Sequence, residues 1–170
     1  MTNQTFFKGA PVQLAGHFVK AGMKAPDFSL VTAELTRFAL ADGRGKRLLL
    51  NIFPSIDTAV CSLSVRKFNA FAAGLNQTLV LCVSKDLPFA QSRFCGAEGL
   101  KNVLTLSDFH CDSTFGVDYG VLMKNGILNG LLARAVVIIG PDGVISYAAL
   151  AEDLTGEPDY EGALKALGAR

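Results

Sequence analysis

Two short apolar segments, RLLLNIF at residues 47–53 and TLVLCVS at residues 78–84, most constrain how this chain can fold. Each is a nearly continuous apolar run, which is typical of a β-strand buried on both faces. The segment between them has a helical period instead. Its apolar residues are spaced by three or four positions, at Cys61, Val65, Phe68, Ala72 and Leu75. Buried strands that alternate with helices predict an α/β protein.

The rest of the chain continues this alternation. A small hairpin is expected in the first 20 residues. Further strands are expected at 28–31, 37–40, 103–106, 133–139 and 144–150, and further helices at 88–94, 113–119 and 160–167. The last two strands flank Gly140-Pro141-Asp142-Gly143, a strong hairpin signal, and therefore add antiparallel strands. We predict one α/β domain over residues 1–170, with a mixed sheet flanked by helices.

The helix expected at residues 88–94 has recognisable signals at both ends. Asp86 is a candidate for its N-terminal cap, and Pro88 suits its first turn. Gly96 is the expected stop. Cys95 therefore falls on the last turn of a short helix, where a thiol is able to move as the helix frays. Its position alone fits an ordinary packing cysteine equally well.

Composition and charge exclude several classes of function. With 170 residues, half of them hydrophobic, the chain is long enough for a substantial core. The net charge is +1 and no basic run is present, so neither a nucleic-acid partner nor a membrane partner is expected. The N-terminus does not resemble a secretory signal, and the apolar region 127–139 is too short and too polar for a membrane span. We expect a cytoplasmic protein.

The four cysteines form no C-x-x-C pair, so the sequence contains neither a dithiol motif nor the usual half of a zinc site. Cys82 lies within a buried strand and is expected to be a core residue. Cys111 follows His110, but no second ligand pair accompanies them, and we treat it as incidental. No nucleotide-binding motif is present either. No cofactor and no metal are predicted.

Cys61 occupies the first turn of the helix that follows Pro54, with Asp57 or Thr58 as the natural N-cap. The unpaired N–H groups and the helix dipole favour an anion at that position, and therefore the thiolate form of the side chain. Cys61 also begins the apolar stripe of the helix and should point into the protein. Position alone leaves two interpretations open, a reactive thiolate and a core cysteine.

The spacing Pro54-x-x-x-Thr58-x-x-Cys61 resembles the signature of the peroxiredoxins. The residue types suit attack of a thiolate on the O–O bond of a peroxide. The Thr58 hydroxyl is placed to bond the sulfur and an incoming oxygen, and the proline shields the thiolate. The Cys61 N–H is expected to polarise the peroxide, as preorganised donors do elsewhere.

The resemblance extends over nearly the whole chain. NIFPSIDTAVCSLSVRKFN, SKDLPFAQSRFCGAEGL, GLLARAVVII and EPDYEGAL are similar to the thiol peroxidase branch of the peroxiredoxins, the atypical two-cysteine enzymes. It implies a thioredoxin-like fold with an N-terminal β-hairpin, a homodimer and an antioxidant peroxidase that thioredoxin reduces. By position, Cys61 corresponds to the peroxidatic cysteine and Cys95 to the resolving cysteine. Pro54, Thr58 and Arg134 correspond to the other active-site residues.

Arg134 stands out without the family. It interrupts an apolar run at its beginning, where an arginine is costly unless its charge is paired or reaches water. A thiolate with a bound peroxide would supply the pairing. A strand-end arginine extending to solvent is the alternative. The apolar segment 126–132, which precedes it, is a candidate lining for a pocket that accepts alkyl peroxides.

From these observations we expect a peroxidase that reduces hydrogen peroxide and organic hydroperoxides. Cys61 becomes a sulfenic acid and then forms an intramolecular disulfide with Cys95, which thioredoxin reduces. A peroxide sensor that passes its disulfide to a regulatory partner uses the same residues, so the sequence does not separate the two. We also expect the segment from about Asp86 to Gly96 to rearrange if the two reduced sulfurs lie apart.

Overall fold

A computed structural model describes residues 3–168. It contains a two-stranded sheet and a seven-stranded mixed sheet. The strands are β1 (Gln4–Phe7), β2 (Ala10–Gln13), β3 (Ser29–Thr32), β4 (Arg37–Ala39), β5 (Arg47–Ile52), β6 (Thr78–Ser84), β7 (Leu104–Ser107), β8 (Ala135–Ile139) and β9 (Ile145–Leu150). The helices are α1 (Ala59–Ala72), α2 (Pro88–Glu98), α3 (Phe115–Asp118) and α4 (Tyr160–Ala166), with a 3-10 helix, η1 (Leu40–Gly43).

The larger sheet has the order β4-β3-β7-β6-β5-β8-β9. β5, β6 and β7 are parallel to one another, and the outer pairs on both sides are antiparallel. The two apolar runs of the sequence are the central parallel strands β5 and β6. The mixed sheet, the flanking helices and the N-terminal hairpin formed by β1 and β2 are as the sequence predicts. We propose that residues 1–170 form a single domain.

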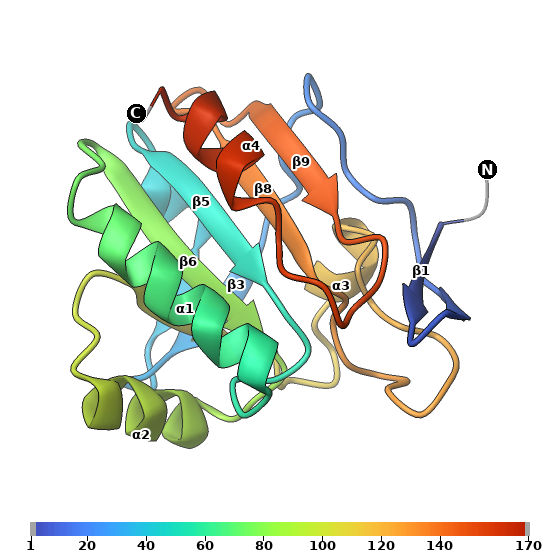
Figure 1. Ribbon diagram of the computed structural model, residues 1–170. Helices are drawn as coiled ribbons and strands as arrows, with labels where there is room; N and C mark the ends of the chain where they lie inside the picture. Colours follow the sequence, from blue (N-terminus) through green and yellow to red (C-terminus); the bar gives the residue numbers. More distant parts are fainter. Residues whose placement is uncertain (1–2, 169–170) are drawn as a thin grey trace.

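The central strands are buried on both faces because helices cover both sides of the sheet. Helices α1 and α4 lie on the face turned toward the viewer in Figure 1, and α3 lies behind the sheet. Along β5 the side chains alternate. Leu48, Leu50 and Ile52 join the core on the α3 side, and Leu49 joins the core beneath α1 and α4. This explains why the segment appears as a continuous apolar run in the sequence.

Helix α1 begins where its N-cap predicts. Thr58 has an extended backbone, and its hydroxyl oxygen accepts a hydrogen bond from the Cys61 N–H. The buried residues Cys61, Ser64, Val65 and Phe68 then recur every three or four positions and face the sheet. Of the two candidate caps, the structure uses Thr58.

Helix α2 differs from expectation at both ends. It runs to Glu98 and not to Phe94, because Gly96 stays helical and Gly99, at φ 65°, provides the left-handed C-cap. Pro88 occupies the first turn as expected, but the N-cap is Leu87 and makes no side-chain bond. Asp86 does not cap the helix, because its carboxylate bonds to other partners.

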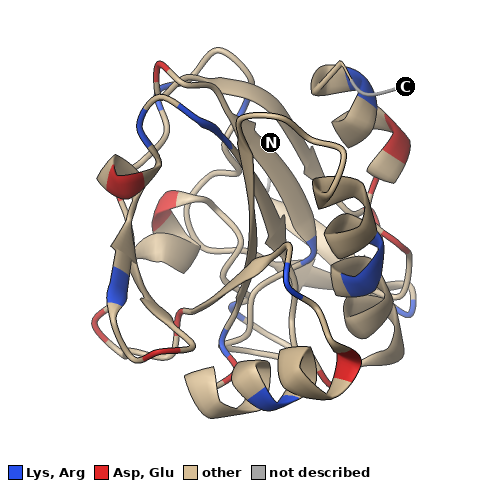
Figure 2. Ribbon diagram, turned by 90° about the vertical axis from the view of Figure 1, so that its left-hand side faces the viewer, with Lys and Arg blue, Asp and Glu red and all other residues tan. Residues whose placement is uncertain are grey.

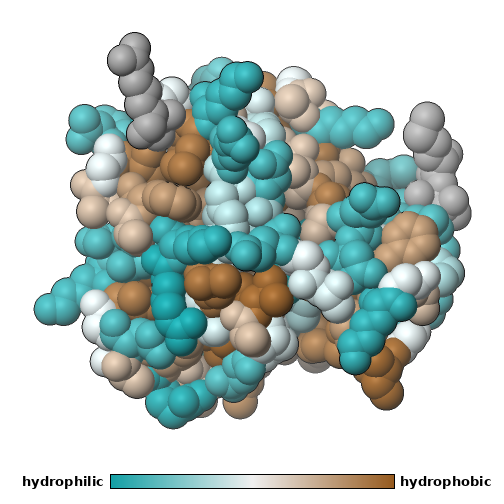
Figure 3. All heavy atoms as spheres, in the orientation of Figure 1, coloured by the Kyte–Doolittle hydropathy of each residue, from teal (hydrophilic) through white to brown (hydrophobic). Residues whose placement is uncertain are grey.

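The surface carries charges of both signs. Lysine and arginine are interspersed with aspartate and glutamate along the ribbon (Figure 2). On the face seen in Figure 1, apolar residues lie between hydrophilic ones (Figure 3). Within residues 3–168, no helix is long and apolar enough to cross a membrane.

Candidate active site

Four of the sequence-predicted residues, Pro54, Thr58, Cys61 and Arg134, meet at the carboxyl ends of β5 and β6. Strands β5 and β6 are parallel and end together, with Ile52 beside Val83. Strand β8 runs the opposite way, so its first residue, Ala135, lies beside Ile52. The loop from Pro54 to Thr58 therefore emerges next to Arg134, although about 80 positions separate them in the sequence.

Cys61 is fully buried at the start of α1. Its N–H donates to Thr58 Oγ1 over 3.2 Å, and this bond leaves the hydroxyl hydrogen of Thr58 able to donate elsewhere. The expectation of a Cys61 N–H directed at the peroxide is therefore not met in this state. The Cys61 carbonyl accepts a hydrogen bond of 2.7 Å from Ser64 Oγ, which itself bonds Asn51 on β5.

Arg134 lies one residue before β8 and is only 2% exposed, so the interpretation of an arginine extending to water is wrong. Its Nη2 lies 3.5 Å from Cys61 Sγ and 3.0 Å from the carbonyl oxygen of Leu154, and its Nε also donates to that oxygen. Nη1 is buried and makes no hydrogen bond to any residue the structure describes. Within residues 3–168, no carboxylate forms an ion pair with Arg134. The Cys61 sulfur is therefore the one side-chain group in that range to which Arg134 is hydrogen-bonded. The hydrogen bond from Lys67 lowers the pKa of the Glu157 carboxyl, which lies near enough for the Arg134 charge to help lower that pKa as well.

A pocket of about 350 Å³ opens beside this pair. Its polar lining residues are Ser55, Thr58, Arg134 and Thr155, Pro54 lies beside them, and the rest is apolar. The apolar part is lined by Phe7, Ala59, Val60, Leu128, Leu131 and Leu154. Leu128 and Leu131 belong to the segment 126–132 that the sequence assigned to a pocket mouth. Cys61 does not line the pocket itself, but its two bonded neighbours, Thr58 and Arg134, do.

A model of the redoxin family matches residues 20–164 of this chain. The chain belongs to the redoxin family. It is 47% identical to the thiol peroxidase of Corynebacterium glutamicum, over 96% of this chain and 98% of the relative. It is 50% identical to the thiol peroxidase of Mycobacterium tuberculosis, over 98% and 99%. These relatives place it in the thiol peroxidase branch of the peroxiredoxins.

Solved structures agree with this placement. A peroxiredoxin-like protein from Aquifex aeolicus is 38% identical, with a TM-score of 0.92 over 99% of this chain and 97% of that one. A thiol peroxidase from Chromobacterium violaceum is 22% identical and supports the fold alone, with a TM-score of 0.88 over 97% and 95% of the two chains. They confirm the thioredoxin-like fold of this redoxin.

The other cysteines of this redoxin occupy three different environments, and all four thiols are free. Cys95 is half-buried on α2, where burial raises the pKa of its thiol. Cys82 is fully buried on β6, and burial raises the pKa of its thiol to about 12 although Asn51 hydrogen-bonds the sulfur. Cys111 is exposed. The structure therefore agrees with Cys82 as a core residue, and it contains no bond between Cys61 and Cys95.

Asp86 was missed as a site residue by the sequence reasoning. It follows the end of β6 and reaches the loop that precedes α1. Its Oδ1 accepts from Ser55 Oγ over 2.8 Å, and its Oδ2 accepts from the Ile56 N–H and from Ser84 Oγ, each over 2.6 Å. A signal was available, because residues that follow the ends of neighbouring parallel strands lie at the same sheet edge.

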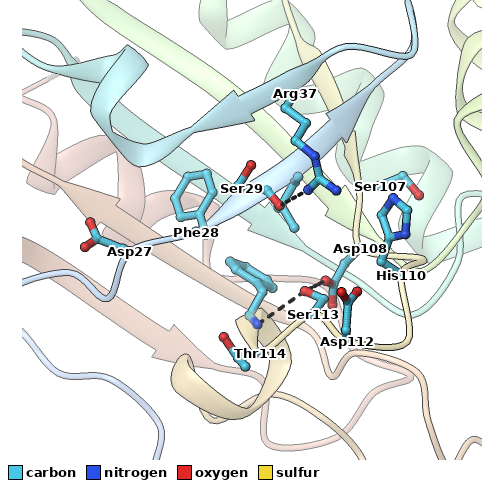
Figure 4. A pocket seen from close by; sticks show the side chains of 12 residues that line it. Asp27, Phe28, Ser29, Arg37, Ser107, Asp108, His110, Asp112, Ser113 and Thr114 are labelled. Atoms are coloured by element: carbon cyan, nitrogen blue, oxygen red, sulfur yellow. Dashed lines mark hydrogen bonds between the residues drawn. The ribbon is translucent and has the colours of Figure 1, made fainter.

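A second pocket, of about 380 Å³, shares no lining residue with the first. Its polar side chains include Asp27, Arg37, Asp108, His110 and Ser113 (Figure 4). The buried Asp108 is already paired, because Lys85 Nζ lies 3.0 Å from Oδ2 and the Ser113 hydroxyl donates to Oδ1. Among residues 3–168, no group of three His, Cys, Asp or Glu side chains is arranged to hold a metal ion.

Proposed function

We propose that this thiol peroxidase reduces hydroperoxides through the Cys61 thiolate, which Arg134 stabilises. The buried contact between Arg134 Nη2 and Cys61 Sγ carries the proposal. A guanidinium taken out of water is costly unless an opposite charge accompanies it. No carboxylate in the described chain forms an ion pair with Arg134, and the sulfur is the one side-chain group there to which it is hydrogen-bonded, which supports a negatively charged sulfur as its partner.

In the first step, the Cys61 thiolate attacks one peroxide oxygen. A sulfur–oxygen bond forms, the O–O bond breaks, and the departing alkoxide takes a proton and leaves as an alcohol, or as water from hydrogen peroxide. Cys61 becomes a sulfenic acid. Arg134 Nη1 and the Thr58 hydroxyl hydrogen are the free donors among the polar residues that line the pocket and stabilise the charge that develops on the oxygens. Pro54 shields the thiolate.

In the second step, the Cys95 thiol of the same chain attacks the sulfenic sulfur. A disulfide forms and water leaves. Cys95 packs against the apolar core that contains Cys61, but the two are unbonded here. A disulfide needs Cα atoms within about 7 Å of each other, so part of α2 must leave its position if the two residues lie farther apart than this in the reduced protein.

The apolar pocket supports organic hydroperoxides as the substrate class. Leu128, Leu131 and Phe7 offer an apolar surface to the organic part of a hydroperoxide, while the oxygens lie at the Arg134 end. We therefore expect organic hydroperoxides such as cumene hydroperoxide to react faster than hydrogen peroxide. Comparable second-order rate constants for the two would contradict this assignment.

A dithiol protein must return the two electrons in each cycle, and we propose thioredoxin for that role and the cytoplasm as the compartment. The family resemblance supports both. We also propose that the protein is a homodimer. Beside the resemblance, exposed apolar side chains that gather near the start of α2 support it, namely Leu35, Leu87, Phe89 and Phe109.

The test is to add one equivalent of cumene hydroperoxide to the fully reduced protein and to map disulfides by non-reducing peptide mass spectrometry. A single Cys61–Cys95 disulfide at monomer mass is expected, and the Cys111→Ser variant should behave identically. No loss of thiols, or a disulfide that joins two chains, would contradict the proposal. Repeated turnover with thioredoxin is expected of a peroxidase, whereas a sensor would stop after one oxidation.

A further inference from the structure

Asp86 joins two parts of the protein that the reaction brings together. Its carboxylate holds the loop before α1, which carries Pro54 and Thr58 and leads to Cys61. The residue itself belongs to the short connection between β6 and α2, the helix of Cys95. Among residues 3–168, Asp86 is the one carboxylate from another element that accepts hydrogen bonds from the loop 54–58. The Asp57 carboxylate, which belongs to the loop, accepts instead from Arg93 on α2.

The bonds of Asp86 fix that loop at two successive residues. The Ile56 N–H and the Ser55 hydroxyl donate to the two different oxygens of one carboxylate, over 2.6 and 2.8 Å. Ser55 Oγ in turn accepts from the Asp57 N–H, and the Ser55 carbonyl accepts from the Thr58 N–H over 3.2 Å. The carboxylate is therefore connected through a short series of bonds to Thr58, the residue that caps α1 and bonds the Cys61 N–H.

Asp86 is itself held firmly. Ser84 Oγ donates to it and also accepts from Nε2 of the fully buried Gln91, which bonds the Leu106 carbonyl as well. The Ser107 hydroxyl donates to the Asp86 carbonyl oxygen. A group anchored to two neighbouring strands is able to impose a position on a loop, whereas a free surface carboxylate is not. Charge-assisted bonds of this kind are also stronger than neutral ones.

We propose that Asp86 is a positioning residue for the peroxide reaction. Its carboxylate fixes the turn 54–58, and this holds the Thr58 hydroxyl and Pro54 in the positions from which they contact the oxygens of a peroxide bound beside Cys61. The residue acts through the loop and does not touch the substrate, since it is not among the residues that line the pocket. The inference rests on the proposed function, because it concerns the same thiolate and the same substrate.

The consequence is a difference between two reactions of one thiol. Attack on a peroxide needs an in-line approach and placed donors, and a displacement of about 1 Å costs up to about a hundredfold in rate. Alkylation by iodoacetamide needs the thiolate but no donors placed for a peroxide. Losing Asp86 should therefore slow the first reaction much more than the second.

The experiment compares Asp86→Ala, Asp86→Asn and Ser55→Ala with the parent protein. Rates of Cys61 oxidation by cumene hydroperoxide and of Cys61 alkylation by iodoacetamide are measured by quenched flow and peptide mass spectrometry. For Asp86→Ala we expect the peroxide rate to fall about 10- to 100-fold and the alkylation rate to change less than threefold. The peroxide rate of Asp86→Asn, which keeps one acceptor oxygen, should lie between those of Asp86→Ala and the parent.

The matched control is Asp57→Asn, which removes a carboxylate from the same loop. Asp57 bonds only Arg93 through its carboxylate among the described residues, and both side chains are more than 60% exposed, so the peroxide rate should stay close to that of the parent. If Asp86→Ala fails to fold, the smaller change Asp86→Asn carries the test, because Ser55 itself lines the pocket and its replacement is able to act on the substrate directly. Ser55→Ala combined with Asp86→Asn should slow the reaction less than the product of the single effects.

Two results would overturn the inference. One is a peroxide rate in Asp86→Asn and Ser55→Ala equal to that of the parent. The other is an equal fall in both reactions, which would indicate a general loss of structure around Cys61. A parent protein that does not react with peroxide at all would refute the proposed function instead, so the two failures are distinguishable.

Discussion

At the scale of single residues, Arg134 is the side chain that we propose to stabilise both the Cys61 thiolate and the peroxide oxygens. Replacing it with methionine keeps the length of the side chain and removes the charge and the donors. Loss of preorganised donors of this kind costs about 100- to 1,000-fold in rate, and we expect such a fall in the rate of Cys61 oxidation. The rate of Cys61 oxidation in Arg134→Lys should lie between the rates of the parent and of Arg134→Met, because lysine keeps the charge but not the forked geometry.

Arg44→Met serves as the control for this change, because Arg44 lies at the end of η1 and lines neither the Cys61 pocket nor the hollow at the start of α2. Since the chain contains no tryptophan, the reaction is best followed by rapid quenching with an alkylating reagent and mass spectrometry. An Arg134→Met protein that reacts within threefold of the parent rate would show that the buried contact with the sulfur has no catalytic value.

Cys82 gives a prediction about stability and pH. Burial raises the pKa of its thiol from the ordinary 9.0 to about 12. Above pH 9 the unfolded chain releases this proton while the folded protein keeps it, so the unfolded state binds fewer protons and stability falls as pH rises. The slope contributed by this thiol approaches about 1.4 kcal/mol per pH unit between pH 9 and 12.

Urea unfolding under reducing conditions from pH 8 to 10 measures this slope below the range where tyrosines dominate. Cys82→Ala should flatten the fall in the free energy of unfolding with pH, even though the cavity lowers stability at every pH. Cys111→Ser, at an exposed thiol, should keep the parent slope. Cys95 adds to the slope in both variants, because burial raises the pKa of its thiol as well. An unchanged slope in Cys82→Ala would refute the prediction.

The sequence was most informative where chemistry lies in one short segment. The spacing of Pro54, Thr58 and Cys61 is local and survives folding unchanged. Arg134 was detectable because a charge inside an apolar run is anomalous in any fold. The Leu154 carbonyl and the Asp86 carboxylate were not found, because their bonds join residues 20 and 30 positions apart. Every residue has a backbone carbonyl, so the residue type at position 154 gives no sign that its carbonyl binds Arg134.

At the scale of elements, α2 is attached differently at its two ends. Its start is held by buried hydrogen bonds of Gln91. Beyond Gln91, one residue of α2 is buried, Phe94, which joins the core beneath α1. The other contacts of this part to α1 and the loop before it are two ion pairs of exposed or half-exposed groups, Arg93–Asp57 and Arg66–Glu98. Surface ion pairs contribute little and are screened by salt. The part of α2 beyond Gln91, which carries Cys95, should therefore detach first.

Glu98→Gln tests this order of detachment. It removes the bidentate pair in which Arg66 Nε and Nη2 bond the carboxylate over 2.8 and 3.0 Å. If α2 must move before the disulfide forms, conversion of the Cys61 sulfenic acid to the disulfide should become roughly twofold to fivefold faster, as weak surface pairs allow. The rate of the initial peroxide reaction should stay unchanged. Rapid quenching and mass spectrometry separate the two species.

The control is Glu157→Gln, which removes an ion pair with Lys67 that does not involve α2. It should leave the disulfide step at the parent rate. Raising the salt concentration should accelerate the same step in the parent and much less in Glu98→Gln. A slower disulfide step in Glu98→Gln would mean that the ion pair assists the movement and does not resist it.

The ends of α2 show where prediction from sequence stops. Gly96 and Gly99 are both acceptable helix stops, and only the structure shows that Gly99 adopts the left-handed conformation. Asp86 has the right type and nearly the right position for an N-cap, but a better set of donors lies across the sheet edge. Helix α1 was predicted more closely, because its long apolar face is set by burial against the sheet.

At the scale of the whole molecule, the sequence specified the layers better than the strand order. The buried runs identified the central strands, and the turn at residues 140–143 identified the β8–β9 hairpin. The pairing of β3 with β7 and of β5 with β8 joins distant segments and has no local signal. The active site depends on the second of these pairings, because it brings Arg134 to Cys61.

The start of α2 also offers a surface for a second copy of the chain. Phe89 is 66% exposed and stands at the edge of a hollow of about 270 Å³ lined by Leu35, Leu87 and Phe109. Around a two-fold axis, the Phe89 of each copy is able to enter the hollow of the other, which makes the contact self-complementary. This end of α2 is the firmly anchored one, so dimer formation and movement of Cys95 are compatible.

Phe89→Glu should therefore weaken the proposed dimer. Removing an aromatic anchor and placing a charge in an apolar contact should raise the dissociation constant about 10- to 100-fold, as measured by sedimentation velocity over a range of protein concentrations. Met23→Glu is the matched control, because Met23 is also an exposed apolar residue and lies outside this hollow. An unchanged dissociation constant in Phe89→Glu would show that the dimer interface lies elsewhere on the protein. A monomeric parent would refute the dimer. A monomeric Phe89→Glu variant should still form the Cys61–Cys95 disulfide at the parent rate. That result would show that each subunit forms the disulfide without its partner, as an intramolecular disulfide requires.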